Sequence, residues 1–302
     1  MLLQIYLLYN KFIRKKLEVF TMKFRFAAFA DESSSDFCGQ VDALKRNGYE
    51  FLEIRNVDGR NFTKLTAQEA KELADVLRAN GLSVRSLGSP IGKIKIEDDF
   101  AAHVELLKHT LELGNIFGAQ QIRLFSFFMP KGEEPAPYRS KVIDQLGVMA
   151  ETAKAFGVQA CHENEKGIYG DNAARCLELL EAIPELKAVF DPANFVQCGQ
   201  DTLEAWELLK GYVDYMHIKD ALPTGKVVPP GMGAGNVPAI VAKYAAQGGE
   251  VLSLEPHLSN FVGLKALEQE GDESIVGDMK FESTEAAFDF AANNLYRIVE
   301  GI

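Results

Sequence analysis

The sequence predicts a single-domain α/β protein, a (β/α)8 TIM barrel, over residues 22–302. From Met22 onward, eight short apolar segments alternate with eight amphipathic segments, the pattern of repeated strand and helix units around a parallel sheet. This number of elements also suits a barrel, whose usual size is roughly 250 residues. No linker rich in Pro, Gly and Ser divides the chain, so we expect one domain.

The strands are expected where short apolar runs are bounded by polar or glycine-containing stretches. In chain order they are residues 24–29, 51–55, 84–87, 121–125, 158–162, 188–190, 215–218 and 251–254.

The helices are expected where apolar residues recur at helical spacing. They are residues 36–47, 67–80, 98–116, 140–156, 172–183, 201–210, 237–247 and 282–299. Several close with a glycine just before the next strand, where a left-handed residue is favoured: Gly48, Gly81, Gly157 and Gly248.

An open, doubly wound sheet is the alternative fold. Its nucleotide-binding forms carry GxGxxG after the first strand, but AFADESSSD stands there, and GxxxxGK[ST] does not occur in the chain. The barrel is therefore preferred. Its long segments after strands, residues 126–139, 221–236 and 257–280, would lie at the C-terminal end, where barrel enzymes keep their active sites.

Composition excludes some classes of function. The chain has 43 Asp and Glu against 32 Lys and Arg, and its net charge of -11 would repel a nucleic-acid backbone. Four cysteines without close spacing predict neither a zinc knuckle nor a disulfide framework, and they fit a reducing cytoplasm. The longest N-terminal apolar run, Leu2 to Tyr9, is too short to cross a bilayer, so no membrane partner is expected.

Residues 1–21 are expected to be an extension outside the barrel. Their apolar run precedes their Arg and Lys residues, the reverse of a secretory leader. Two interpretations remain open: Met22 is the true start of translation, or the segment is an added amphipathic helix.

Four residues with metal-binding side chains end the last four predicted strands. They are Glu163, Asp191, His217 and Glu255. Because the carboxyl ends of all barrel strands meet at one rim, these side chains are expected to point at one spot. Three carboxylates so close would raise one another's pKa unless a cation lay among them.

A divalent metal ion would remove this conflict. Three oxygen ligands and one nitrogen, with room for two more, suit a six-coordinate ion such as Mn2+ or Mg2+, with Co2+ or Zn2+ able to compete. We therefore predict one divalent ion, Mn2+ first. The alternative is that each residue is an ordinary strand-end residue, with Asp191 capping a turn and His217 held by hydrogen bonds.

The segments CHENEK, FDPANF, MHIKDA and LSLEPH, in this order, resemble the metal-site motifs of the xylose-isomerase-like TIM barrel family, the sugar phosphate isomerase/epimerase group. The resemblance runs from about Met22 to the C-terminus and is strongest over residues 158–257. It implies that Glu163, Asp191, His217 and Glu255 bind one metal ion, and that Glu163 and Glu255 also transfer protons.

The sequence departs from the family at the site. Asn194 stands where sugar epimerases have a histidine, three residues after the aspartate; an amide can bind a substrate hydroxyl but cannot take up a proton. Lys219 and Asp220 stand where the epimerases place an arginine. Lys219 is predicted to hold a substrate oxygen, with a solvated pair with Asp220 as the alternative. His257 is predicted to face the substrate if the last strand continues beyond Glu255.

The predicted reaction is proton transfer through an enediolate on a non-phosphorylated sugar or keto-sugar, which makes the protein an isomerase or epimerase of carbohydrate metabolism. A metal-dependent lyase or dehydratase that acts on a keto-sugar, keto-glycoside or inosose is the alternative. An abasic-site nuclease is disfavoured, because that relative uses more histidines than the five here. A non-catalytic scaffold also remains open. Long loops such as 257–280 are compatible with a homo-oligomer.

Four further expectations concern single residues and one loop. His103 is assigned to the surface of its helix, and Tyr215 and His162 to the packing between sheet and helices. The segment PGMGAGN, residues 230–236, is expected to be a flexible loop without a phosphate site, because no basic cluster accompanies it.

Overall fold

A closed barrel of parallel strands forms the centre of the computed structural model, which describes residues 24–261 and 275–302. Neighbouring strands follow the order β1-β12-β9-β8-β7-β6-β5-β2, and the predicted (β/α)8 fold is confirmed. The strands are β1 (Arg25–Ala28), β2 (Phe51–Ile54), β5 (Ser83–Leu87), β6 (Gln121–Leu124), β7 (Gln159–Glu163), β8 (Lys187–Phe190), β9 (Val213–Ile218) and β12 (Val251–Leu254). The expected extension, residues 1–21, lies outside the described residues.

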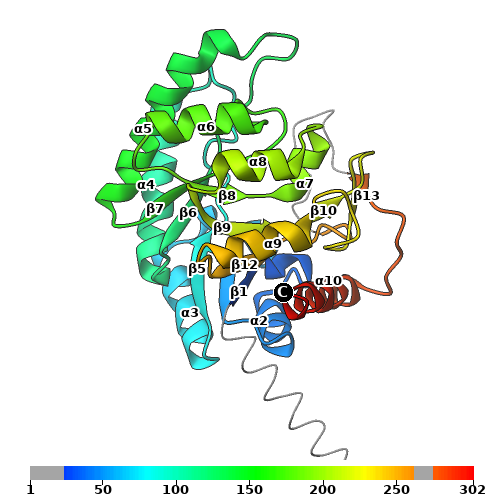
Figure 1. Ribbon diagram of the computed structural model, residues 1–302. Helices are drawn as coiled ribbons and strands as arrows, with labels where there is room; N and C mark the ends of the chain where they lie inside the picture. The colour runs from blue at the N-terminus through cyan, green and yellow to red at the C-terminus, as the bar shows by residue number, and fades with distance from the viewer. Residues whose placement is uncertain (1–23, 262–274) are drawn as a thin grey trace, which may run out of the picture.

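Helices surround the strands (Figure 1). They are α2 (Phe37–Arg46), α3 (Ala67–Ala79), α4 (Phe100–Phe117), α5 (Arg139–Ala155), α6 (Ala173–Ala182), α8 (Thr202–Leu209), α9 (Val237–Ala246) and α10 (Thr284–Glu300). The helix ends follow from the sequence. Thr66 and Glu69 form a capping box at the start of α3. The four predicted glycines all adopt positive φ: Gly48, Gly81, Gly157 and Gly248.

Short elements not predicted from the sequence gather at the C-terminal end of the barrel. Each follows the carboxyl end of a barrel strand, directly or within the same connection, so this end carries additional structure over the strand ends. They are η1 (Ala30–Glu32), β3 (Asn56–Val57), β4 (Arg60–Asn61), η2 (Phe62–Lys64), η3 (Ala136–Tyr138), α7 (Pro192–Gln197), β10 (Asp220–Ala221), β11 (Lys226–Val228) and β13 (Ile275–Val276).

The main apolar core lies between the strands and the helices. Trp206 of α8 is buried there, with its ring 5.4 Å from that of Phe190 on β8 and 6.2 Å from that of Tyr244 on α9. Burial of a large apolar side chain contributes roughly 1.5–3 kcal/mol, so contacts of this kind fix the helices on the sheet.

The barrel closes where its first strand pairs with its last one along the chain. β1 pairs in parallel with β12, with Arg25 opposite Val251. Outside this pair, α10 lies beside α2 (Figure 1), and Arg46 of α2 approaches Asp289 of α10 to 2.8 Å. In the part of the chain that the structure describes, no helix is long and apolar enough to cross a membrane.

Candidate metal centre

The structure brings the four strand-end residues together at the C-terminal end of the barrel. Glu163 is the last residue of β7, Asp191 follows β8, His217 lies near the end of β9, and Glu255 follows β12. All four are buried, and each offers a ligand atom within 4.8 Å of those of the other three. Their convergence follows from the topology, because β7, β8, β9 and β12 are consecutive neighbours in the barrel.

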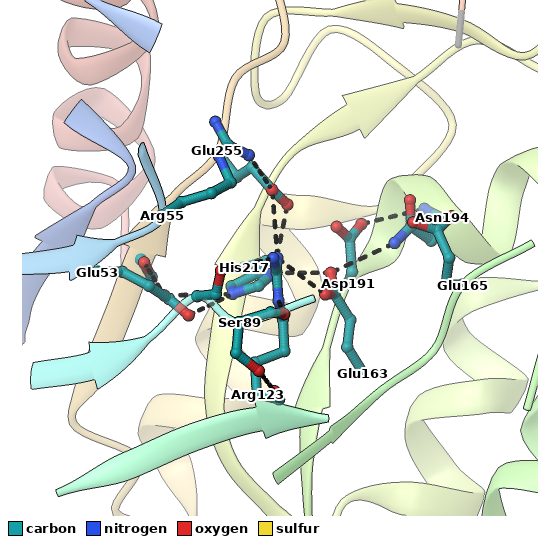
Figure 2. A network of polar contacts seen from close by, with 12 residues as sticks. Glu53, Arg55, Ser89, Arg123, Glu163, Glu165, Asp191, Asn194, His217 and Glu255 are labelled. Carbon is teal, nitrogen blue, oxygen red and sulfur yellow. Dashed lines mark hydrogen bonds and ion pairs between the residues drawn. The ribbon is translucent and has the colours of Figure 1, made fainter. Parts of the chain in front are cut away.

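The imidazole of His217 lies at the centre of this group (Figure 2). Its Nδ1 is 2.8 Å from Oε1 of Glu163 and 3.3 Å from Oε2 of Glu255. Its Nε2 points the other way, toward Glu53 of β2. Burial alone would lower the pKa of His217, but the carboxylates of Glu163, Glu53 and Glu255 outweigh it and raise the pKa well above its ordinary value. These carboxylates therefore favour the positively charged form of the ring.

Asp191 is held rigidly by its neighbours in sequence and in space. As the N-cap of α7, it accepts a hydrogen bond at Oδ1 from the Asn194 backbone N–H at 3.0 Å. The side chain of Asn164 bonds to both the backbone N–H and the carbonyl of Asp191, at 3.0 and 2.9 Å. Burial raises the pKa of Asp191 to about 6.

Three buried cationic side chains surround the carboxylates. Arg123 Nη1 lies 3.1 Å from Glu163 and 3.5 Å from Glu255. Lys219 Nζ lies 2.9 Å from Asp191 and 3.4 Å from Glu255. Arg55 Nη1 lies 2.9 Å from Glu255. Although burial alone would raise it, the pKa of Glu255 lies well below its usual value, because Lys219, His257 and His217 favour the charged form.

Arg55 is fixed by a second group of acids from the loop after β1. Its guanidinium makes two hydrogen bonds of 2.9 Å to Asp31 and one of 3.1 Å to Glu32. It also lies 4.5 Å from the ring centre of Phe29. With these partners Arg55 is a structural counter-charge beside Glu255, and its side chain is wholly buried.

The donor set fits a divalent ion by two observations. Oε2 of Glu163 and Oδ2 of Asp191 are buried and make no hydrogen bond with any residue that the structure describes. Both lie within ion-pair distance of a cation, Arg123 at 3.1 Å and Lys219 at 2.9 Å, but without hydrogen-bond geometry. These lone pairs are thus free for a ligand of positive charge. Three carboxylates and one imidazole are also ligands that Mn2+, Mg2+, Co2+ or Zn2+ accept.

The three residues predicted to bind substrate are all buried around the group. Asn194 donates from Nδ2 to the carbonyl of Asn164 at 2.9 Å and to Glu163 at 3.4 Å, so it holds Glu163 in place. Lys219 contacts two of the expected ligands rather than solvent, which rules out the solvated pair with Asp220. A direct contact of either side chain with substrate stays a prediction.

His257 follows the end of β12 in a left-handed conformation, with φ of 45°. Its Nε2 lies 3.3 Å from Glu32 and 3.5 Å from Glu255. These three residues also offer ligand atoms within 4.8 Å of one another. Nη1 of Arg55, however, lies 3.4 Å from the same His257 nitrogen, so a positively charged side chain already lies within this second group.

Two expectations about histidine and tyrosine are wrong. His103 is buried on α4, and its Nε2 accepts a hydrogen bond from the Gly92 N–H at 2.8 Å. Tyr215 lies two residues before His217 on β9 and shares its face, so its hydroxyl reaches Glu53 at 2.8 Å inside the barrel. By contrast, His162 points away from Glu163 and meets Ser126 at 3.0 Å.

The glycine-rich segment 230–236 is also not the flexible loop expected. The carboxylate of Asp220 accepts hydrogen bonds from the backbone N–H groups of Gly231, Gly233 and Gly235 at 3.0, 2.9 and 2.8 Å. The glycines leave room for this approach, since a Cβ on Gly233 would lie 2.3 Å from Asp220 Oδ1. Asp220 therefore fastens this loop beside the end of β9.

Sequence reasoning named Arg55 only as a possible contact to a substrate hydroxyl, and it missed Arg123 and Glu53 as parts of the centre. Each lies within or directly after an apolar strand, where a charged residue is rarely buried unless it is paired. Charges in the middle of FLEIR and QIRLF were the available indication that these strands line a polar interior.

Comparison with known proteins shows what the chain resembles. A family model described as xylose isomerase-like TIM barrel matches residues 41–275. Among solved structures, the chain is similar to an IolI protein with a binding zinc atom, at 15% identity and a TM-score of 0.71 over 92% of this chain and 99% of that one. It is similar to L-ribulose 3-epimerase at 21% identity and a TM-score of 0.70, over 92% and 94% of the two chains.

A third similar structure is the probable 3-DHS dehydratase AsbF of Bacillus anthracis, involved in petrobactin synthesis. The identity is 17% and the TM-score 0.67, over 88% of this chain and 97% of that one. No curated protein sequence matches the chain. At these identities the solved structures show a shared fold, and the reaction has to be argued from the site.

Proposed function

Because the chain belongs to the xylose isomerase-like TIM barrel family, we propose that it is a divalent-metal-dependent isomerase or epimerase of non-phosphorylated sugars or keto-sugars. One observation carries the proposal. Glu163, Asp191, His217 and Glu255 converge within 4.8 Å in a buried site at the end of the barrel where such enzymes act. Two carboxylate oxygens of this group have no hydrogen-bond partner among residues 24–261 and 275–302.

The ion would be held by these four residues. When bound, it would act as a Lewis acid that stabilises negative charge on substrate oxygens as a neighbouring C–H bond breaks. Mn2+ is our first expectation, since oxygen ligands predominate. The zinc atom in the IolI structure supports a divalent ion in this fold without selecting the metal here.

The proton transfers fall to Glu163 and Glu255. In Figure 2 the two carboxylates approach His217 from different directions, as required if one removes a proton from one face of a substrate carbon and the other returns a proton to the opposite face. The glutamate that removes the proton must be ionised and the one that returns a proton must be protonated. Arg123 Nη1, 3.1 Å from Glu163 and 3.5 Å from Glu255, places a positive charge beside both carboxylates. Transfer to the opposite face gives epimerisation, and transfer to the adjacent carbon gives isomerisation.

Lys219 completes the proposed chemistry. Its ammonium group lies between Asp191 and Glu255, so it adds positive charge where an enediolate oxygen would develop. Asn194 holds Glu163 at 3.4 Å and orients its carboxylate.

A metal-dependent lyase is the second candidate, favoured by the likeness to a probable dehydratase. The same two glutamates would serve it. One, in its ionised form, would remove a proton from carbon, and the other, in its protonated form, would donate its own proton to a hydroxyl group that departs from the β position as water. The carbon skeleton would then lose water instead of regaining its proton.

The test uses purified protein reconstituted with Mn2+ and a panel of hexoses, ketoses, 3-keto-sugars and inososes in D2O. We expect NMR to show deuterium entering a substrate C–H position without loss of a group. Loss of water would favour the lyase instead. Glu163→Gln should abolish exchange, whereas Glu105→Gln, on the exposed face of α4, should leave it unchanged. Absence of both metal binding and exchange across the panel would overturn the proposal.

A further inference from the structure

Glu53 lies on the side of His217 that faces away from the candidate metal ligands (Figure 2). Both of its carboxylate oxygens are 3.3 Å from Nε2 of His217. The side chains of both residues are wholly buried. Glu53 comes from β2 and is not one of the four residues that converge on the candidate ion site.

Hydroxyl groups hold this carboxylate from two sides. Tyr215 donates a hydrogen bond of 2.8 Å to Oε1, and Ser253 donates one of 2.5 Å to Oε2. The Tyr215 hydroxyl also lies 2.9 Å from that of Ser86. Because the tyrosine hydrogen is directed to Glu53, Ser86 must donate to Tyr215. The hydroxyl hydrogens in this series of hydrogen bonds are therefore all directed toward Glu53.

This arrangement determines which nitrogen of His217 carries a hydrogen. An ionised carboxylate can only accept hydrogen bonds, so Nε2 must donate to it. In a neutral imidazole the other nitrogen then keeps its lone pair. That nitrogen is Nδ1, which faces Glu163 at 2.8 Å and Glu255 at 3.3 Å.

We propose that Glu53 is a positioning residue that holds His217 with its hydrogen on Nε2 and the lone pair of Nδ1 directed at the metal ion. The inference rests on the metal site of the proposed function. Glu53 would act in two ways: it selects one of the two neutral forms of the ring, and its charge makes the ring a stronger ligand. Packing alone does not require a charge here, since burying one costs several kcal/mol.

Metal affinity separates this role from a structural one. Zn2+ is the probe, and its dissociation constant is measured by competition with a chromophoric chelator for wild-type protein, Glu53→Gln and Ser86→Ala. Glu53→Gln keeps the shape but removes the charge, so we expect binding to weaken about 10–100-fold. Ser86→Ala disturbs the same buried cluster but keeps the hydrogen bonds of Glu53 to Tyr215, Ser253 and His217, and should bind zinc nearly as wild type does. Equal affinities for wild type and Glu53→Gln would overturn the inference.

A second measurement needs no variant, in case Glu53→Gln fails to fold. In zinc-loaded wild-type protein with 15N-labelled histidine, NMR should find the hydrogen of His217 on Nε2 and the metal on Nδ1. The opposite assignment would overturn the inference while leaving the metal site intact. If wild-type protein binds neither Zn2+ nor Mn2+, the proposed function itself fails, and this outcome is distinct from the other two.

Discussion

At the scale of single residues, the burial of His162 makes the stability of the protein depend on pH. Burial lowers its pKa to about 3, against an ordinary value of roughly 6.5 for an unfolded chain. Below pH 6.5 the unfolded chain binds a proton that the folded protein does not. The contribution of His162 to the unfolding free energy is therefore fully present above pH 6.5. It is lost as the pH decreases toward 3, at up to about 1.4 kcal/mol per pH unit.

We predict that His162→Gln makes the unfolding free energy depend less steeply on pH between pH 6.5 and 4. The slope should fall by the amount that corresponds to about one bound proton, as measured by urea denaturation at a series of pH values. Ser126→Ala removes the hydrogen bond but keeps the imidazole buried, so its pH dependence should follow the wild type. An unchanged slope in His162→Gln would contradict the assignment.

Arg123 is predicted to stabilise the protein most when no metal is bound. Arg123→Gln removes the cation that faces both Glu163 and Glu255, and loss of one partner from a buried ion pair costs about 3–5 kcal/mol. Chemical denaturation of chelator-treated protein should show a loss of this size, with added Mn2+ restoring more stability in the variant than in wild type.

Arg46→Gln is the matched control, because its pair with Asp289 is partly exposed and should contribute at most about 1 kcal/mol. If Arg123→Gln cost no more than this control, Arg123 would not be the counter-charge described.

The sequence revealed the candidate ligands because each falls at a strand end, where the topology brings strand ends together. Their counter-charges were harder to find. Arg123 and Glu53 lie inside strands, and which face of a strand a residue occupies depends on barrel register, which sequence alone leaves undetermined. The Ser253 and Tyr215 contacts with Glu53 join different strands and have no local pattern.

At the scale of elements, the loop over residues 230–236 is predicted not to tolerate alanine at Gly233. Gly233→Ala would place Cβ 2.3 Å from Asp220 and 2.5 Å from the backbone oxygen of Ala221, so the loop must move. We expect a loss of about 1–3 kcal/mol and faster proteolytic cleavage in this loop.

Gly147→Ala is the matched control for that change. Gly147 lies inside α5, with nothing within 4 Å of an added Cβ, so alanine should stabilise the helix by about 0.5–1 kcal/mol. Thermal unfolding should thus move in opposite directions for the two variants. If Gly233→Ala were more stable than wild type, the hydrogen bonds between Asp220 and this loop would not constrain it.

Long elements were predictable and short ones were not. Barrel strands and outer helices repeat an apolar period, and the observed bounds lie within a few residues of those expected. Helix α7 and strands β10, β11 and β13 are too short to show a period, and β11 pairs with β13 from a distant part of the chain. The expected oligomer contact over residues 257–280 falls partly outside the described residues.

At the scale of the whole molecule, the proposed metal site would link ion binding to folding. An ion bound only by the folded state stabilises it, by roughly 2.7 kcal/mol when its free concentration is 100 times its dissociation constant. We predict that adding Mn2+ to chelator-treated protein raises the midpoint of thermal unfolding.

Asp191→Asn should lose this response to Mn2+. The amide can still cap α7 through its oxygen, so the fold is kept while a ligand charge is lost. An equal rise in the midpoint for this variant would place the ion elsewhere.

The pairing of β1 with β12 also bears on how the protein is made. A nascent chain leaving the ribosome presents its first strand early, but the neighbour that covers one edge of that strand is synthesised almost last. Until then the growing sheet has two open edges that can recruit other chains. Since Glu255 directly follows β12, closure of the barrel and completion of the candidate ligand set coincide, and a chain truncated before β12 would lack both.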